Sequence, residues 1–288
     1  SCTHWKELQD TLKYHAHMAA LLKTLTIFRF LNVPFSGCRQ EFGVAHRGES
    51  FIEEDLAMAD RTIEDASPMG ATLLTDQIYA IQKRIFRWAP KLMAMNKKVV
   101  VTIATDGLPT DLSGAEGKDQ RDMFTQALKE LLRLPVWLVI RLCTNDQKVI
   151  NFYNELDRVL ELSIEVLDDL NKEAKEIRKF NKWLNYTLPL HRCREMGFKH
   201  RLFDLVDERK LTPGELRDYC KLLFGKDQLE GISDPDVDLR SFLSDLKRGE
   251  INGSNTSQWN VLQNKQTALV DLKKIRKIYG GRHRFLRF

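Results

Sequence analysis

The stretch Lys97-Lys-Val-Val-Val-Thr-Ile-Ala-Thr105 decides the fold of this chain, because it joins β-branched and apolar residues in one continuous run. Such runs are typical of strands in a parallel sheet whose two faces are both covered by helices. We therefore expect this segment to be a strand in the middle of a parallel sheet, with the residue after Thr105 emerging at an edge where ligands bind.

Downstream of this strand, two more apolar runs alternate with helical patterns. Leu134 to Leu142 and Leu162 to Leu167 are predicted to be buried strands, and residues 120 to 132, 146 to 160 and 169 to 180 are predicted to be helices. Strands that alternate with helices of this length form right-handed crossovers. The sequence therefore predicts a doubly wound, mostly parallel sheet.

Upstream, apolar residues recur at three- and four-residue spacing over residues 5 to 23, which predicts an amphipathic helix. Two short runs, 26 to 31 and 41 to 45, can pair as antiparallel strands at an edge of the sheet. Helices are expected at residues 51 to 64 and from Leu74 onward. The expected fold class is thus α/β with one antiparallel edge hairpin and a helical C-terminal extension.

The alternation stops near Trp183, which divides the chain into three expected parts. Residues 1 to 182 would form the α/β domain and residues 183 to 248 a helical extension, in which Thr212-Pro-Gly-Glu215 has the pattern of a capping box. Residues 249 to 288 would be a linker and a basic tail. The net charge is +5, and residues 265 to 288 carry a balance of +7, which leaves the first 264 residues at −2.

Directly after the valine-rich strand stands Thr105-Asp106-Gly107-Leu108-Pro109-Thr110-Asp111. A buried strand that ends in T-D-G-x-P-T-D resembles the third metal-binding motif of von Willebrand factor A (vWA) domains. The loop Gly70-Ala-Thr72 has the Gly-x-Thr context that precedes a helix in that family. The order of expected strands and helices from Trp5 to Phe180 is also similar to the family.

The resemblance implies that Asp106 and Thr72 contribute oxygen ligands to Mg²⁺, with the last coordination position filled by a carboxylate from a partner protein. The family's first motif, D-x-S-x-S at the end of a central strand, is absent from this sequence. Thr72 and Asp106 are therefore expected to form an incomplete metal site. Either a longer protein supplies the missing strand and binds Mg²⁺, or the site is dead and another segment fills the sheet; these 288 residues alone are expected to bind no cofactor.

The favoured function is protein binding, by a scaffold or a subunit of a complex, through a contact surface around Thr72, Asp106 and Asp111, with no catalytic residues. One alternative is a hydrolase or transferase that uses carboxylates at the same edge, with Asp106 and Asp168 as candidates, although Asp168 and Asp169 are also ordinary helix caps. Another is an assembly subunit that is anchored to RNA or an acidic surface by its basic tail. Nucleic acid is the less favoured partner.

Other residue patterns exclude common classes. The five cysteines are widely spaced and contain no C-x-x-C pair, which favours a reduced, intracellular protein over a disulfide scaffold or zinc site. The longest apolar run, Leu134 to Ile140, is too short to span a membrane. No P-loop, G-x-G-x-x-G, G-x-S-x-G or H-E-x-x-H motif is present.

The histidines are interpreted as structural residues. His15 and His17 lie two residues apart on a helix and face different directions, so they cannot form a helical metal pair. His191, Cys193 and His200 stand close in sequence, but no second Cys/His pair follows at zinc spacing.

Overall fold

The computed structural model describes residues 4–34, 39–67, 70–160, 164–252 and 257–281. Part of the loop before Thr72, the start of the third predicted strand, the middle of the predicted linker and the end of the predicted tail lie outside the described residues. The chain divides into two compact units, which we describe separately. Unit 1 contains the chain up to Asp168 together with Glu195–Gly197, and unit 2 contains Asp169–Arg194 and the chain from Phe198 onward.

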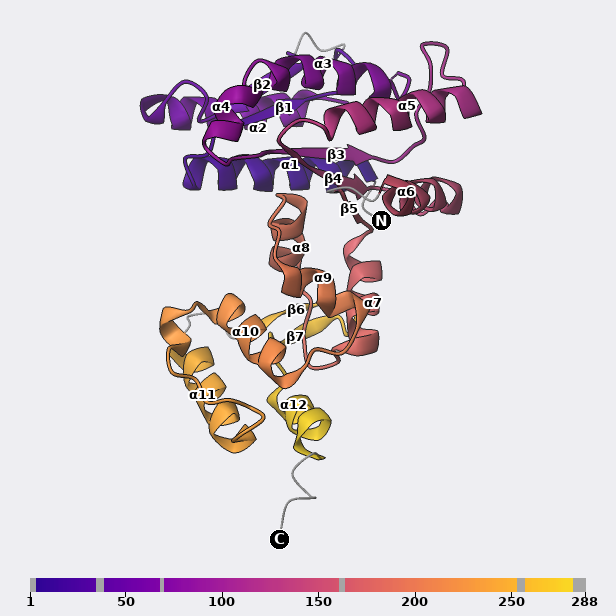
Figure 1. Ribbon diagram of the computed structural model, residues 1–288. Coiled ribbons are helices and arrows are strands. Elements are labelled where there is room, and N and C mark those ends of the chain that lie inside the picture. Colours follow the sequence, from indigo (N-terminus) through magenta and orange to yellow (C-terminus); the bar gives the residue numbers. More distant parts are fainter. Residues whose placement is uncertain (1–3, 35–38, 68–69, 161–163, 253–256, 282–288) are drawn as a thin grey trace. The chain divides into compact units, whose positions relative to one another are not determined.

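Unit 1 is an α/β unit with a three-stranded parallel sheet of order β3-β4-β5 (Figure 1). This confirms the α/β class, the parallel sheet and the three strands in their predicted order. Its elements are α1 (His4–Leu21), β1 (Thr26–Arg29), β2 (Glu41–Val44), a 3₁₀ turn (Glu49–Phe51), α2 (Ile52–Asp65), α3 (Leu74–Phe86), α4 (Ala89–Ala94), β3 (Val99–Thr105), α5 (Lys118–Leu131), β4 (Val136–Leu142), α6 (Gln147–Leu160) and β5 (Ile164–Leu167).

The central strand of this sheet is β4, and the prediction that the valine-rich segment lies in the middle is wrong. Among the described residues β3 pairs with β4 alone, so β3 is an edge strand. Every residue of β4 is buried, whereas Val100 on β3 is 43% exposed. The reason is that burial of a strand depends on neighbours on both sides, which the strand's own sequence does not specify.

Side chains of β4 alternate between two layers of helices. Val136, Leu138, Ile140 and Leu142 belong to a core cluster with buried residues of α3, α5 and α6. Arg141 points to the opposite face, where it reaches Glu7 on α1. Figure 1 shows α1 on one side of the sheet and α3 and α5 on the other. Helices therefore cover β4 on both faces of the sheet.

The two predicted N-terminal strands do form an antiparallel pair, β1 with β2, in the register Thr26 opposite Val44. They form a separate two-stranded sheet, however, and do not pair with β3. Phe28 and Phe42 stack with their ring centroids 5.3 Å apart and pack with buried residues of α1 and α2 in a core cluster of their own. Together with a small cluster of Trp137, Val139 and Leu167, the described part of unit 1 therefore contains three apolar clusters rather than one.

Unit 2 is largely helical and has a single core that includes Trp183, Tyr219 and Phe242. Thr212 and Glu215 form the predicted capping box at the start of α10. Its elements are α7 (Leu170–Phe180), α8 (Leu188–Glu195, whose last residue belongs to unit 1), α9 (Arg201–Glu208), α10 (Pro213–Phe224), a 3₁₀ turn (Asp227–Leu229), α11 (Leu239–Asn252), β6 (Ser257–Asn260), β7 (Lys265–Ala268) and α12 (Leu272–Tyr279).

The boundary between the units differs from the one expected at residue 182. Helix α7 was assigned to the α/β domain, but it belongs to unit 2 because Ala174 and Ile177 are buried in the core of that unit. Its spacing of apolar residues predicts a helix correctly but does not indicate which core receives the apolar face.

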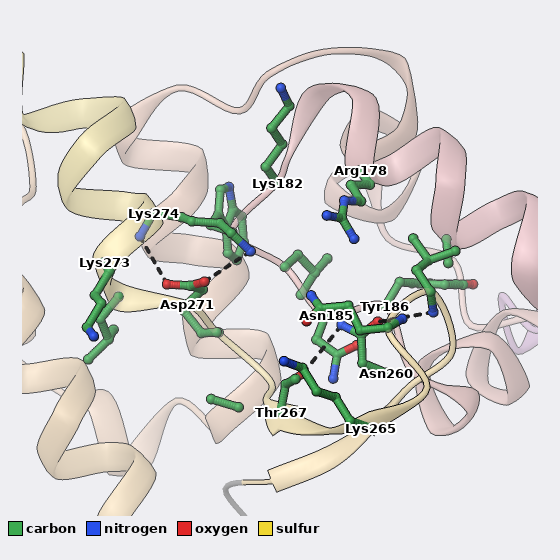
Figure 2. A pocket seen from close by; sticks show the side chains of 18 residues that line it. Arg178, Lys182, Asn185, Tyr186, Asn260, Lys265, Thr267, Asp271, Lys273 and Lys274 are labelled. Carbon is green, nitrogen blue, oxygen red and sulfur yellow. Dashed lines mark hydrogen bonds and ion pairs between the residues drawn. The ribbon is translucent and has the colours of Figure 1, made fainter.

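The prediction of a linker and a basic tail from residue 249 to 288 is also wrong for the described part. The segment 249 to 252 completes α11, β6 and β7 form an antiparallel hairpin, and α12 packs into the core of unit 2. Ile275 and Tyr279 are buried, and the Tyr279 hydroxyl donates to the Leu211 carbonyl at 2.8 Å. The basic residues of α12 occupy the outer face, and some of them line a cavity (Figure 2).

Candidate functional site

The candidate site lies at the carboxyl end of β3, where the chain leaves the sheet through Asp106 and Gly107. The structure brings this loop against the loop that precedes α3. The Thr110 backbone N–H donates to the Thr72 carbonyl at 3.0 Å, and the Thr72 N–H donates to Thr110 Oγ1 at 2.9 Å. Thr72 and the T-D-G-x-P-T-D segment therefore meet, as the sequence indicated.

Gly107 lies at the close approach of the two loops. A Cβ atom at this position would make an ordinary contact with Thr72 Oγ1, at 3.4 Å. The Gly107 carbonyl accepts hydrogen bonds from the Tyr153 hydroxyl at 3.1 Å and from Thr105 Oγ1 at 3.2 Å. The loop is thus fastened to the loop before α3, to β3 and to α6, which limits the conformational entropy that is lost on binding a partner.

Tyr153 is a buried phenol close enough to Asp106 for the aspartate charge to affect its pKa. Its side chain is fully buried, and this burial raises the pKa of the phenol well above its usual value. The negative charge of Asp106 raises the pKa further, because a second anion nearby is unfavourable. Tyr153 therefore stays protonated at neutral pH and serves as a hydrogen-bond donor behind Asp106.

Asp106 and Asp111 differ in their hydrogen bonds to the described residues. Asp106 is exposed, and its carboxylate forms no hydrogen bond or ion pair with the residues that the structure describes. Asp111 accepts from the Ser113 N–H, the Ser113 hydroxyl and the Ala115 N–H at 2.8, 2.6 and 3.0 Å. These hydrogen bonds, the Ser113 hydroxyl first among them, hold the pKa of Asp111 below its usual value. Asp111 shapes the turn, so Asp106 is the carboxylate that remains for a partner.

The residues present do not make a complete Mg²⁺ site. Mg²⁺ takes six oxygen ligands in near-octahedral geometry. Thr72 and Asp106 offer a hydroxyl and a carboxylate, while Asp111 is engaged in its own turn. In the described parts of the chain, no three His, Cys, Asp or Glu side chains come together as a possible metal site. Further ligands would have to come from outside the described residues.

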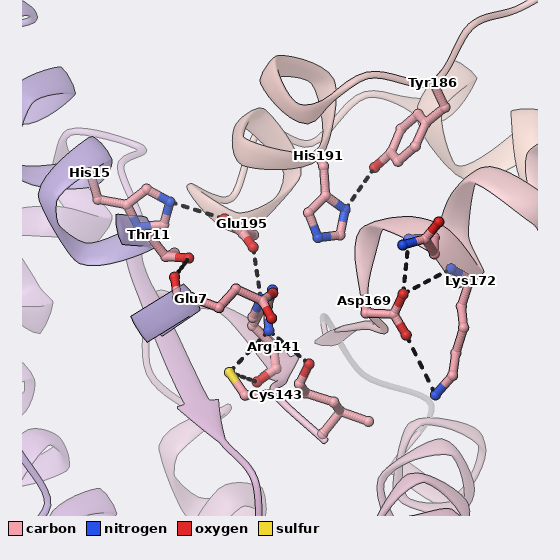
Figure 3. A network of polar contacts seen from close by, with 12 residues as sticks. Glu7, Thr11, His15, Arg141, Cys143, Asp169, Lys172, Tyr186, His191 and Glu195 are labelled. Carbon is pink, nitrogen blue, oxygen red and sulfur yellow. Dashed lines mark hydrogen bonds and ion pairs between the residues drawn. The ribbon is translucent and has the colours of Figure 1, made fainter. Parts of the chain in front are cut away.

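A second polar cluster in unit 1, which sequence reasoning missed, surrounds Arg141 near the carboxyl end of β4 (Figure 3). Arg141 Nε donates to Glu195 Oε1 at 2.8 Å, and Nη2 forms an ion pair with Glu7. His15 Nε2 lies 3.3 Å from the other Glu195 oxygen. The single Arg within the apolar run Val-Trp-Leu-Val-Ile-Arg-Leu142 was the available signal, since a buried guanidinium requires anionic partners.

Cys143, directly after β4, also contacts Arg141, with Sγ 3.0 Å from Nη1. Burial raises the pKa of the Cys143 thiol to about 11, although the Arg141 charge acts in the opposite direction. The thiol is therefore protonated at neutral pH and is a poor nucleophile. This cluster holds β4, α1 and Glu195 together.

The remaining predicted residues have structural partners. Asp169 caps α7 by accepting from the Asn171 and Lys172 N–H groups, which confirms its interpretation as a helix cap. Asp168 ends unit 1 at the start of this turn. His191 is buried with Nδ1 3.2 Å from the Tyr186 hydroxyl, and His200 caps α9. No helix in the described part of the chain is long and apolar enough to cross a membrane.

No protein-family model matches this chain, and neither characterised proteins nor solved structures include a significant match to it.

Proposed function

We propose that unit 1 is a vWA-like protein-binding module whose contact surface is the edge formed by Thr72 and Asp106. The observation that carries the proposal is the exposed Asp106 carboxylate, which has no partner among the described residues and sits on a loop fastened by hydrogen bonds. A charged group held in place before binding can accept hydrogen bonds from a partner at little cost in conformational entropy.

The free edge of β3 supports the same proposal. The backbone groups of Val99 and Thr105 point toward β4. The Val99 N–H donates to the Pro135 carbonyl, and the Thr105 carbonyl accepts from the Cys143 N–H. Because backbone groups alternate along a strand, those of Val100, Thr102 and Ala104 point to the outer edge. Such an edge is a template for another strand.

We propose that the occupant is an extended segment of a partner protein that runs along β3 and ends beside Asp106. A strand in this position would pair with the outer backbone groups of β3 while one of its side chains contacts the edge. Without metal, that side chain would be a Lys or Arg that pairs with Asp106. With Mg²⁺ bound between the two proteins, it would be a carboxylate, as the resemblance to vWA domains implies.

The test is a selection of peptides from a random displayed library on the immobilised full chain, followed by fluorescence anisotropy with the selected peptides. Asp106→Ala is expected to weaken their binding about tenfold, because a charge-assisted hydrogen bond is lost. Asp122→Ala removes an exposed carboxylate from α5 in the same unit and is the matched control, with affinity expected to stay within about twofold. Equal binding to Asp106→Ala, or a library that gives no binder, would contradict the proposal.

The free edge is tested separately with Thr102→Pro. Proline removes an N–H from the outer edge of β3 and leaves the β3–β4 ladder intact, because the Thr102 N–H does not point toward β4. It also removes the hydrogen bond from Thr102 Oγ1 to the Glu195 carbonyl, so Thr102→Val, which removes that bond alone, is the control. Peptide binding should fall while the circular dichroism spectrum is retained. Repeating the titrations with Mg²⁺ and with EDTA distinguishes a metal bridge from a direct contact, since binding that persists in EDTA excludes the bridge.

A further inference from the structure

Unit 2 contains a cavity of about 470 Å³ that is lined only by residues of this unit and so is distinct from the candidate site at β3 (Figure 2). Its walls come from two stretches of the chain: the end of α7 with residues 182 to 186, and the β6–β7 hairpin with the first turn of α12 that follows it. This volume is within the range of cavities that hold small ligands.

The charge of the cavity is strongly positive. Its lining includes the basic side chains Arg178, Lys182, Lys265, Lys273 and Lys274, against one acidic residue, Asp271. The first four form no ion pair with other residues that the structure describes. Cations gathered around a concave surface reinforce one another's potential, which concentrates anions there.

Asp271 does not neutralise this charge, because it is already used within α12. Its carboxylate accepts from the Lys274 N–H at 3.0 Å and forms an ion pair with Lys274 Nζ, also at 3.0 Å. Partial burial acts to raise the pKa of Asp271, but these contacts outweigh it and hold the pKa below its usual value. Asp271 and Lys274 therefore form a closed pair, and the other four cations remain available for a ligand.

The backbone around the cavity is fixed by contacts between its segments. The Asn185 N–H donates to the Leu269 carbonyl at 2.9 Å, and the Asp271 N–H donates to the Trp183 carbonyl at 2.8 Å. Leu184 and Val270 form an isolated antiparallel bridge. The concave surface therefore exists before any ligand arrives, and the basic side chains extend from a rigid frame (Figure 2).

We propose that this cavity binds a small ligand that carries two or more adjacent phosphate groups. Several unpaired cations on one concave surface match the several anionic oxygens of such a group, and Arg and Lys are the side chains that recognise phosphate. The aromatic residues of the lining, Trp183 and Tyr186, are only 1% and 3% exposed, so the lining offers no ring on which a nucleic-acid base could stack. This favours a small phosphorylated molecule over single-stranded RNA.

The test is a calorimetric titration of the full chain with tripolyphosphate, with inorganic phosphate as the comparison probe. Tripolyphosphate is expected to bind with one-to-one stoichiometry and more tightly than phosphate, and its affinity should fall as salt rises. Lys273→Gln should weaken tripolyphosphate binding about fivefold, because one charged contact is lost. Lys182→Gln combined with Lys273→Gln should weaken it about 25-fold if the two contacts are independent.

Lys277→Gln is the matched control, because Lys277 is an exposed lysine on the same helix and is absent from the cavity lining. Its affinity should stay within about twofold of the original protein. The proposal would be overturned if tripolyphosphate did not bind at millimolar concentration. It would also be overturned if Lys277→Gln weakened tripolyphosphate binding as much as Lys273→Gln does. A short single-stranded RNA that binds while tripolyphosphate does not would have the same consequence, since the site would then be an extended basic surface. Peptide binding at Asp106 is measured independently, so either proposal can fail alone.

Discussion

Strands β3 and β4 are neighbours with similar apolar sequences, yet the structure uses them differently. β4 lies between two strands and carries a buried, paired Arg141, while β3 is paired on one side and exposes Val100. The chain leaves β3 at the exposed Asp106 and leaves β4 at the buried Cys143. The comparison teaches that position within the sheet, rather than apolar content, separates a strand that stabilises the unit from one that can present a contact surface.

The largest expected effect concerns the charge inside β4. Arg141→Leu should lower the free energy of unfolding by about 4 kcal/mol, because the fully buried Glu195 carboxylate loses its guanidinium partner. Glu7→Gln should cost less than about 1 kcal/mol, because Glu7 is 41% exposed and can be solvated. Urea-induced unfolding at pH 7 measures both values.

The double variant Arg141→Leu/Glu195→Leu provides the control for this prediction. It removes both charges and should recover part of the lost stability, since apolar side chains can replace a buried ion pair. An Arg141→Leu protein as stable as the original would show that β4 does not depend on this pair.

The second expected effect compares the packing of the two strands directly. Leu138→Ala on β4 should cost about 3 kcal/mol, because Leu138 is completely buried and its removal leaves a cavity. Val100→Ala on β3 should cost about 0.5 kcal/mol, because Val100 is 43% exposed. Chemical denaturation of the two variants measures the difference, and similar losses would mean that the face of β3 that carries Val100 is covered in solution.

The smallest of the three effects is the pH dependence of stability that arises from Cys143, directly after β4. Because burial raises the pKa of Cys143 to about 11 from an ordinary 9.0, the folded protein keeps the thiol proton longer than the unfolded chain. The resulting stabilisation is complete below pH 9 and is lost as the pH rises toward 11. Between pH 9 and pH 11, the free energy of unfolding of the original protein should therefore fall by about 2 kcal/mol more than that of Cys143→Ala.

Unfolding curves at pH 8, 9 and 10.5 measure this loss. Alkylation with iodoacetamide at pH 8, located by mass spectrometry, gives an independent readout, because a protonated thiol reacts slowly. Rapid native-state alkylation of Cys143 would show that the end of β4 is open to water, as the end of β3 is.

Much of the local structure was predictable because it depends on short-range chemistry. The periodicity around Phe124 and Ile150 predicted α5 and α6, and Thr212 with Glu215 predicted the start of α10. The Gly-x-Thr loop before α3 and the T-D-G loop after β3 do meet, as the resemblance to vWA domains implied, through the hydrogen bonds between Thr72 and Thr110. The sequence pattern did not distinguish the free Asp106 from the engaged Asp111, since that depends on a turn closed by Ser113 and Ala115.

The tertiary structure alone decided where each element is used. Residues 249 to 288 have the composition of a linker and tail, but the few apolar residues of α12, Ile275 and Tyr279 among them, are enough to bury that helix in unit 2. This packing also creates the basic cavity, whose walls come from residues 174 to 186 and residues 260 to 274. By itself the sequence determined the strands and most helices as far as α7, the start of α10 and the exposed loop after β3, because these follow from local propensity and periodicity. Strand order, the partners of Arg141 and the cavity required tertiary structure, because burial and charge pairing depend on residues that are distant along the chain.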